Sequence, residues 1–188
     1  MARGLLFYTP NPKPKSLDIY PIPSLNNTIM KHFTKFELIK CYQQHKNQRC
    51  HECRLTAPAH TLPNGIEANL EALVDNVLDP ARELLGEPIH VNSGFRCPLH
   101  NAAVGGVAKS QHTLGEAADI TAGSPAENLK LARIIAHLSN YDQMILYVNN
   151  GSMEPQFIHV SWKRNGINRH RILKHVTGTS GYSAVTSL

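Results

Sequence analysis

Three residues in the second half of the chain have the types and spacing of metal ligands: His112, Asp119 and His159. Asp119 lies in an apolar stretch, residues 117–121, where an ionised carboxylate is unfavourable unless it is paired or bound to a metal. Two histidines and one carboxylate leave zinc a fourth position for water, as in catalytic sites, and zinc lowers the pKa of that water to about 7. The alternative is that each is a tolerated polar residue, since 11 histidines make chance clusters easy. From residue types alone, the three residues form a candidate catalytic zinc site, and the alternative stays open.

Two short strands are needed to bring these ligands together. The apolar stretch around Asp119 and residues 157–161 around His159 both have the composition of a buried strand. Side chains alternate along a strand, so Asp119 and His159 meet on one face of a sheet if the two strands are neighbours. Gly115 allows the preceding loop to turn, so that His112 can reach the same point.

The segments around these ligands resemble a known family. Residues 110–119 read Ser-x-His-x-x-Gly-x-Ala-x-Asp, and His159 follows forty residues after Asp119 within Ile-His-Val-Ser. This pairing is similar to the zinc D-Ala-D-Ala carboxypeptidases, whose family includes vancomycin-resistance dipeptidases and phage endolysin endopeptidases. Residues 93–96 (Ser-Gly-Phe-Arg) look like its upstream segment, and the similarity covers residues 32–173. Further positions that match the pattern are Asn101, Gly105, Gly106 and residues 141–143.

The resemblance implies a role for each matching residue. It implies that His112, Asp119 and His159 bind Zn²⁺, and that Arg96 stabilises the negative charge that develops on the attacked carbonyl oxygen. A fixed guanidinium in a water-poor site suits that task, whereas a surface ion pair is the alternative role for Arg96. The residues implied in orienting substrate or neighbouring groups are Ser93, Ser110 and Gln143.

The chain departs from the family pattern at the catalytic carboxylate. The family places that carboxylate three residues before the last histidine, where this chain has Gln156. Many small members instead carry a glutamate a few residues after the Asp-Gln pair, where this chain has Tyr147. A neutral glutamine cannot take a proton from water. We therefore expect Glu154 or Asp142 to act as the general base, although Glu154 is equally explained as a solvated loop residue.

The resemblance implies a zinc-dependent hydrolase of amide bonds in peptidoglycan stem peptides, acting as a D,D-carboxypeptidase or as an endolysin-type endopeptidase. The alternative is a zinc-stabilised module that binds the cell wall or has a structural role, with weakened catalysis. A third hypothesis, a nucleic-acid zinc protein, rests on the two-residue spacing of Cys50 and Cys53, which Cys41 could join as a ligand. It lacks a second ligand pair, and reduced cysteines in a surface loop explain the same residues.

Composition narrows the partners and the compartment. The net charge of +5 and pI of 9.1 come from scattered lysines and arginines and are compatible with an anionic polymer such as peptidoglycan. The sequence shows no basic stripe and no known nucleic-acid-binding motif. No apolar run is long enough for a membrane span, and the first apolar patch stops at Pro10, too early for a signal peptide. We expect a monomer that is made in the cytoplasm and acts on the wall after release, as phage-encoded enzymes do.

The remaining segments predict a single α+β domain over residues 30–176, with a small antiparallel sheet flanked by helices. The resemblance implies that this domain is hedgehog/DD-peptidase-like. A proline-rich arm is expected over residues 1–29 and a flexible tail over residues 177–188. Thr34 and Glu37 form a capping-box pattern. Further expected elements are a helix from residue 66 to Gly86, a strand at 89–91, a helix at 125–139 and a strand at 144–148 that forms a hairpin with 157–161.

Overall fold

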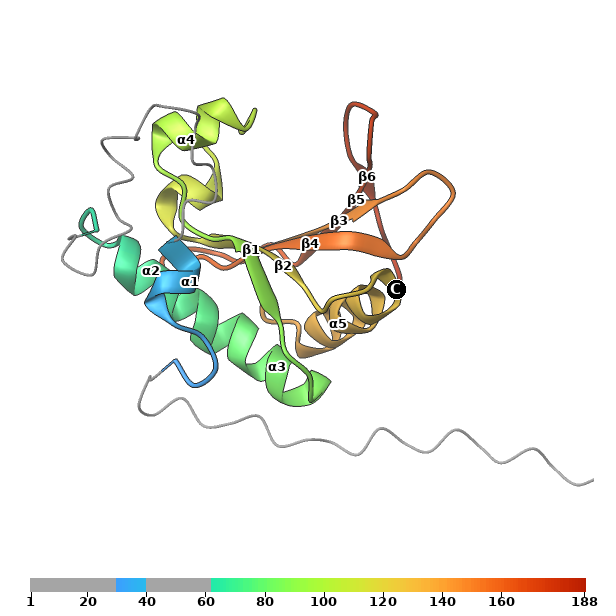
Figure 1. Ribbon diagram of the computed structural model, residues 1–188, viewed down its shortest axis with the longest axis horizontal. Helices are drawn as coiled ribbons and strands as arrows, with labels where there is room; N and C mark the ends of the chain where they lie inside the picture. Colours follow the sequence, from blue (N-terminus) through green and yellow to red (C-terminus); the bar gives the residue numbers. More distant parts are fainter. Residues whose placement is uncertain (1–29, 40–61) are drawn as a thin grey trace, which may run out of the picture.

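A six-stranded sheet forms the centre of the computed structural model, which describes residues 30–39 and 62–188 (Figure 1). The strands lie in the order β1-β2-β4-β3-β5-β6. Their bounds are β1 His90–Ser93, β2 Ala117–Thr121, β3 Gln143–Val148, β4 Pro155–Ser161, β5 Arg171–Val176 and β6 Ser183–Ala184. The helical segments are α1 Lys35–Ile39, α2 Ile66–Leu73, the π-helical η2 Val74–Leu78, α3 Asp79–Leu85, α4 Pro98–Ala103, the 3₁₀-helical η3 Gln111–Leu114 and α5 Pro125–Leu138. The α+β class expected from the sequence is confirmed.

The sheet is mixed, so the expectation of a purely antiparallel sheet was wrong. Adjacent strands from β1 to β3 are antiparallel, but β3 and β5 are parallel, with Ile145 opposite Leu173. Both sides of β4 are occupied by β2 and β3, and the chain that leaves β4 pairs at the other edge of β3. It reverses direction on the way and therefore runs parallel to β3. The antiparallel β6 then adds to β5, within residues 177–188.

The predicted helix from residue 66 to Gly86 is present, but its middle turn is π-helical. Pro80 has no backbone N–H, so it cannot bond the carbonyl of Asn76 four residues earlier. The π-helical segment η2 precedes this proline, and the side-chain Nδ2 of Asn140 donates to the freed Asn76 carbonyl at 2.7 Å. Gly86 ends the helix in the left-handed conformation, with φ of 75°. A side chain from another segment thus supplies the bond that the proline removes.

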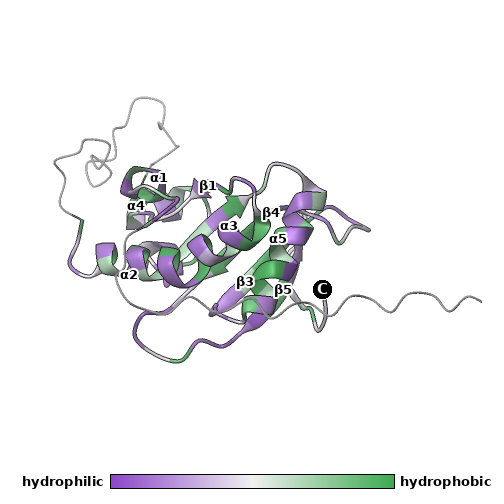
Figure 2. Cartoon of the chain, turned by 90° about the horizontal axis from the view of Figure 1, so that it is seen from below, coloured by the Kyte–Doolittle hydropathy of each residue, from purple (hydrophilic) through white to green (hydrophobic). Residues whose placement is uncertain are grey.

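The helices α2, α3 and α5 lie on one side of the sheet, and α4 lies on the other (Figure 1). The strands behind α3 and α5 are mainly hydrophobic, whereas hydrophilic residues colour the outer parts of these helices (Figure 2). The strand side chains that join the core cluster with these helices are Val91, Ala118, Ile120, Met144, Leu146, Val148, Ile158 and Val160. Because side chains alternate, the intervening residues Asp119, Ile145 and His159 face the opposite side.

Contacts near residues 30–39 attach the first described segment to the rest of the fold. The predicted capping box is confirmed: the backbone N–H of Thr34 donates to Glu37 at 2.7 Å, and that of Glu37 donates to Thr34 Oγ1 at 3.3 Å. The backbone N–H of Phe95 donates to the Leu38 carbonyl at 2.7 Å.

Within residues 30–39 and 62–188, no helix is both long and apolar enough to cross a membrane. The predicted arm at residues 1–29 and the predicted cysteine site at Cys41, Cys50 and Cys53 lie outside the described residues.

Candidate metal centre

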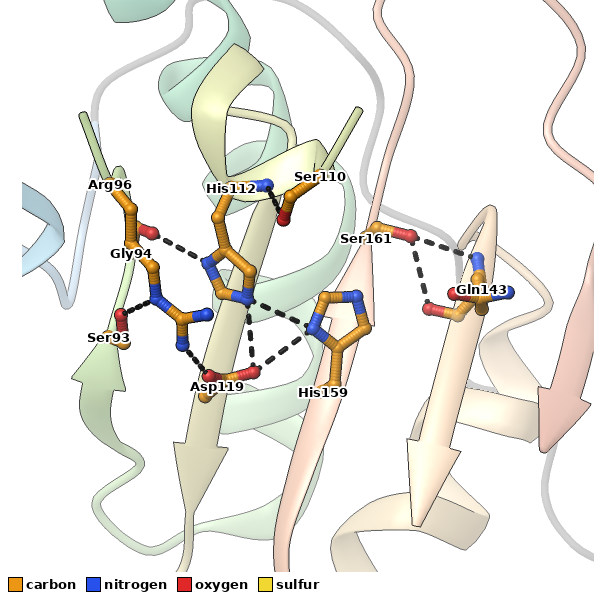
Figure 3. A network of polar contacts seen from close by, with 9 residues as sticks. All are labelled: Ser93, Gly94, Arg96, Ser110, His112, Asp119, Gln143, His159 and Ser161. Atoms are coloured by element: carbon orange, nitrogen blue, oxygen red, sulfur yellow. Dashed lines mark hydrogen bonds and ion pairs between the residues drawn. The ribbon is translucent and has the colours of Figure 1, made fainter. Parts of the chain in front are cut away.

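His112, Asp119 and His159 converge on the face of the sheet opposite the helical core (Figure 3). One candidate ligand atom from each side chain lies within 4.8 Å of the other two. His112 Nε2 is 3.2 Å and His159 Nδ1 is 3.0 Å from Asp119 Oδ1, and the two nitrogens are 3.1 Å apart. All three residues are buried, so the cluster is an internal feature of the fold.

Strand register brings Asp119 and His159 together. In the antiparallel pair of β2 and β4, Asp119 lies directly opposite His159, so both side chains leave the sheet on the same face. The next pair along the two strands, Ile120 and Ile158, points into the core. The expectation that the two strands are neighbours and that the two ligands share a face is confirmed.

His112 is supplied by a short helical turn instead of a strand. Ser110 caps η3, where its Oγ accepts from the backbone N–H of His112 at 3.3 Å. Gly115 ends η3 with φ of 69°, and a Cβ at this position would lie 2.8 Å from the Ile66 carbonyl oxygen. Only glycine combines this left-handed conformation with such close packing. The chain therefore turns sharply between His112 and β2, as expected from Gly115.

Residues 93–96 hold the first contacts around the cluster. A Cβ on Gly94 would lie 2.1 Å from the Leu38 carbonyl oxygen, so glycine lets this backbone pass close to α1. The Gly94 carbonyl lies 2.7 Å from His112 Nδ1 and can only accept a hydrogen bond, so Nδ1 is the protonated nitrogen. Arg96 donates through Nη2 to Asp119 Oδ2 and through Nε to Ser93 Oγ, the latter at 2.7 Å. This segment thus orients both His112 and Asp119.

The ionisation states at the centre follow from burial and hydrogen bonding. Burial opposes ionisation of Asp119, but its contacts with the His112 and His159 rings lower its pKa below the ordinary value. Burial lowers the pKa of His159, against the opposing effect of Asp119. Asp119 is therefore an ionised carboxylate, and His159 is a neutral ring with a lone pair available to a metal.

These donors fit a divalent metal ion such as zinc. With Nδ1 of His112 protonated, its Nε2 lone pair points at a carboxylate oxygen and at His159, which are also electron-pair donors. Electron pairs converging in this way require a proton or a cation between them. Ligands bound to tetrahedral zinc at its usual bond lengths are separated by about 3.3 Å, close to the distances between these atoms. Two histidines and one carboxylate also leave a fourth coordination position free.

The two candidate general bases have different surroundings. Glu154 is exposed and precedes β4, and five residues of extended chain place its Cα about 16 Å from that of His159. Asp142 is fully buried and accepts from Gln111 Nε2 at 3.0 Å and from Arg169 Nε at 2.9 Å. Burial disfavours its charged form, yet these bonds and the Arg169 charge lower its pKa. The role of Glu154 or Asp142 as general base stays a prediction.

The other predicted residues occupy varied positions. Ser93 contacts Arg96, and Ser110 caps η3, so both orient neighbouring groups within the protein. Gln143 begins β3 beside Ser161, and its backbone N–H donates to Ser161 Oγ at 3.1 Å. Gln156 is exposed at an irregularity in the register between β3 and β4, where a bulge re-aims the chain. Tyr147 is half-buried on the same face as the cluster.

Sequence reasoning missed two groups that organise the centre. The first is the Gly94 carbonyl, which determines that His112 is protonated at Nδ1. The Ser-Gly-Phe-Arg segment was predicted to matter, but the role of this carbonyl was not. Arg169 pairs with Asp142, which lies 27 residues earlier in the chain. The role of a backbone carbonyl cannot be predicted from residue types. A buried acidic residue before a strand does indicate that a basic partner exists, but it does not identify that partner.

Comparison with known proteins gives one family. A family model described as Peptidase M15 matches residues 31–161, which is most of the chain and includes all three cluster residues. No curated protein matches the chain.

Proposed function

The chain belongs to the peptidase M15 family, and we propose that it is a zinc-dependent hydrolase of amide bonds in peptidoglycan stem peptides. The observation that carries this proposal is the buried convergence of His112, Asp119 and His159 on one face of the sheet. Its action is either that of a D,D-carboxypeptidase, which removes a terminal D-alanine, or that of an endopeptidase, which cuts within the stem. It acts on the wall after release from the cytoplasm.

The chain's own residues prepare the site for this reaction. Bound zinc would supply a Lewis acid that polarises the attacked carbonyl and activates a water molecule. His112 is held by the Gly94 carbonyl, and Asp119 is held by Arg96, so both ligands are oriented before a metal arrives. The guanidinium of Arg96 is fixed by Ser93 within this buried region, where its charge stabilises an oxyanion more than it would in water.

A second candidate function is a zinc-stabilised module that binds the wall without cutting it. The observation that favours it concerns the carboxylates: among the described strand residues on the face of the cluster, Asp119 is the only one. A hydrolase of this kind ordinarily uses a further group to move the proton. The hydrolase and the binding module share the metal centre, but only the hydrolase releases a product.

Zinc content and product release, measured on the same samples, test the proposal. We expect one zinc ion per chain in the wild type and release of D-alanine or of stem fragments from purified peptidoglycan, identified by mass spectrometry. His159→Ala should lose both properties. Glu154→Gln should keep its zinc, and loss of product release in this variant would identify Glu154 as the general base. Glu87→Gln, at an exposed carboxylate after α3, is the control and should keep both properties. Zinc without product would favour the binding module, and absence of zinc from the wild type would contradict both functions.

A further inference from the structure

A row of aromatic rings crosses the sheet beside the metal centre. Tyr147 of β3 lies opposite Phe157 of β4, and their rings stack with centroids 4.3 Å apart and planes 12° apart. On the other side, the Tyr147 ring is 5.2 Å from that of His175 on β5, and His175 is 5.2 Å from Tyr182. Tyr147 is thus clamped between rings from both neighbouring strands, which fixes the direction of its side chain.

This row is directed toward the metal centre by strand register. His159 lies two residues after Phe157 on the same face of β4, which makes it a diagonal neighbour of Tyr147. Diagonal neighbours in an antiparallel pair have Cα atoms about 7–8 Å apart, within reach of an aromatic side chain. Burial raises the pKa of Tyr147, the Asp119 charge raises it further, and the Arg96 charge opposes this. The Tyr147 side chain therefore lies on the face of the metal centre, one diagonal position from His159.

We infer that Tyr147 is a catalytic residue whose hydroxyl donates a hydrogen bond to the carbonyl oxygen of the scissile amide as negative charge develops there. This inference rests on the proposed hydrolysis. No proton is transferred in the step: the O–H bond stays intact while the carbonyl oxygen gains charge. A neutral phenol is the form that can donate, and burial keeps Tyr147 in that form. A rigid donor stabilises an oxyanion because it needs no reorganisation during the reaction.

Tyr182 and His175 act as positioning residues for this hydroxyl. The nearby Tyr182 side chain contributes to the raised pKa of Tyr147. When substrate binds, rotation about the phenolic C–O bond directs the hydrogen of Tyr147 to the carbonyl oxygen. His175 Nδ1 donates to the Gly181 carbonyl at 2.9 Å, which holds the segment that leads into β6 against β5.

Tyr147→Phe is the critical variant, because it keeps the stacked ring and removes only the hydroxyl. We expect kcat on a stem peptide to fall about 100-fold, with KM, zinc content and melting temperature nearly unchanged. A second measurement does not depend on turnover: binding of a phosphinate analogue of D-Ala-D-Ala to the zinc-loaded protein should weaken by a similar factor, measured by calorimetry. Tyr182→Phe should reduce kcat less, since it changes only orientation. Tyr141→Phe is the control, since Tyr141 lies in the core cluster and its hydroxyl only donates to the His170 carbonyl at 3.4 Å.

The outcomes separate this inference from the proposed function. Equal kcat and equal phosphinate affinity for the wild type and Tyr147→Phe would overturn the role of Tyr147 and leave the hydrolase intact. A wild type that binds the phosphinate but cuts no peptide would overturn the hydrolase, and the affinity comparison would still decide whether the hydroxyl contacts an oxyanion. A wild type that neither binds nor cuts would overturn both.

Discussion

Asp119 shows how one buried carboxylate can serve a metal site both with and without the metal. Its Oδ1 faces the two histidines, and its Oδ2 accepts from Arg96. A buried carboxylate without a partner would destabilise the fold strongly, so the Arg96 charge lets the site persist when no metal is bound. When a divalent cation binds, the centre gains positive charge, which favours an oxyanion or a carboxylate in the fourth coordination position.

At the same scale, Asp75 is a side chain whose charge opposes folding. Burial, together with the nearby carboxylates of Asp79 and Glu71, raises its pKa from 3.8 to about 6. Between these values the folded state binds more protons than the unfolded state, so this residue's contribution to stability falls as pH rises through that window. Above pH 6 both states are ionised, and the charge is less favourable in the folded protein.

Asp75→Asn should therefore stabilise the protein at pH 7.5 but not at pH 4. Asp75 is partly exposed and solvent screens its charge, so we expect a gain of about 1 kcal/mol in the free energy of unfolding. Urea denaturation at the two pH values measures this difference. Glu87→Gln, which neutralises an exposed carboxylate beyond the helix end, is the control and should change little. A gain that is equal at both pH values would contradict the electrostatic explanation.

At the scale of elements, Asn128 joins three parts of the fold around the start of β4. It is fully buried on α5, and its Nδ2 donates to the carbonyls of Pro155 at 3.0 Å and Gln156 at 2.9 Å. Its Oδ1 accepts from the backbone N–H of Ala122 at 2.6 Å and from Thr121 at 3.1 Å. One amide thus satisfies backbone groups at the end of β2 and at the irregular start of β4.

Asn128→Ala should reduce the free energy of unfolding by about 3 kcal/mol, because it leaves several buried polar groups without partners. Chemical denaturation measures the loss. Lys130→Ala, on the same helix, removes only an exposed ion pair with Glu127 and should change stability by less than about 0.5 kcal/mol. If the two variants were equally stable, other groups or water would be satisfying the backbone around β4.

Sequence patterns predict helices and strands correctly where local signals and tertiary structure agree. The strand at 117–121 has the observed bounds of β2, and the helix predicted at 125–139 differs from α5 by one residue. The spacing around His112 and Asp119, with His159 on a second strand, was enough to predict the cluster because strand alternation converts spacing into a shared face.

Other elements depend on contacts that local sequence does not encode. β5 reads Arg-Ile-Leu-Lys-His-Val, without regular alternation, and it becomes a strand because β3 offers it a free edge. The antiparallel expectation failed for the same reason. The irregular register near Gln156 depends on the pairing partner of β4, and the position of Glu154 relative to the cluster follows from it. Pairing Asp142 with Arg169 requires knowing where the connection between β4 and β5 returns.

At the scale of the whole molecule, the metal centre connects segments that are distant in sequence. His112 comes from η3, Asp119 from β2 and His159 from β4. Arg96, which contacts Asp119, lies in the segment that follows β1. An unfolded chain cannot hold these groups within a few ångströms of one another. A metal that binds them therefore binds the folded state preferentially and shifts the folding equilibrium toward it.

We therefore expect zinc to raise the melting temperature of the metal-free protein. At a free zinc concentration 100 times the dissociation constant, linkage predicts about 2.7 kcal/mol of stabilisation, equivalent to about 5–10 °C for a domain of this size. Differential scanning fluorimetry with and without zinc measures the shift. His159→Ala should lose it, whereas His137→Ala, at an exposed position on α5, should keep it. An equal shift in the wild type and His159→Ala would mean that zinc acts elsewhere, with the Cys50 and Cys53 pair as the next site to mutate, because the spacing of these cysteines suits zinc.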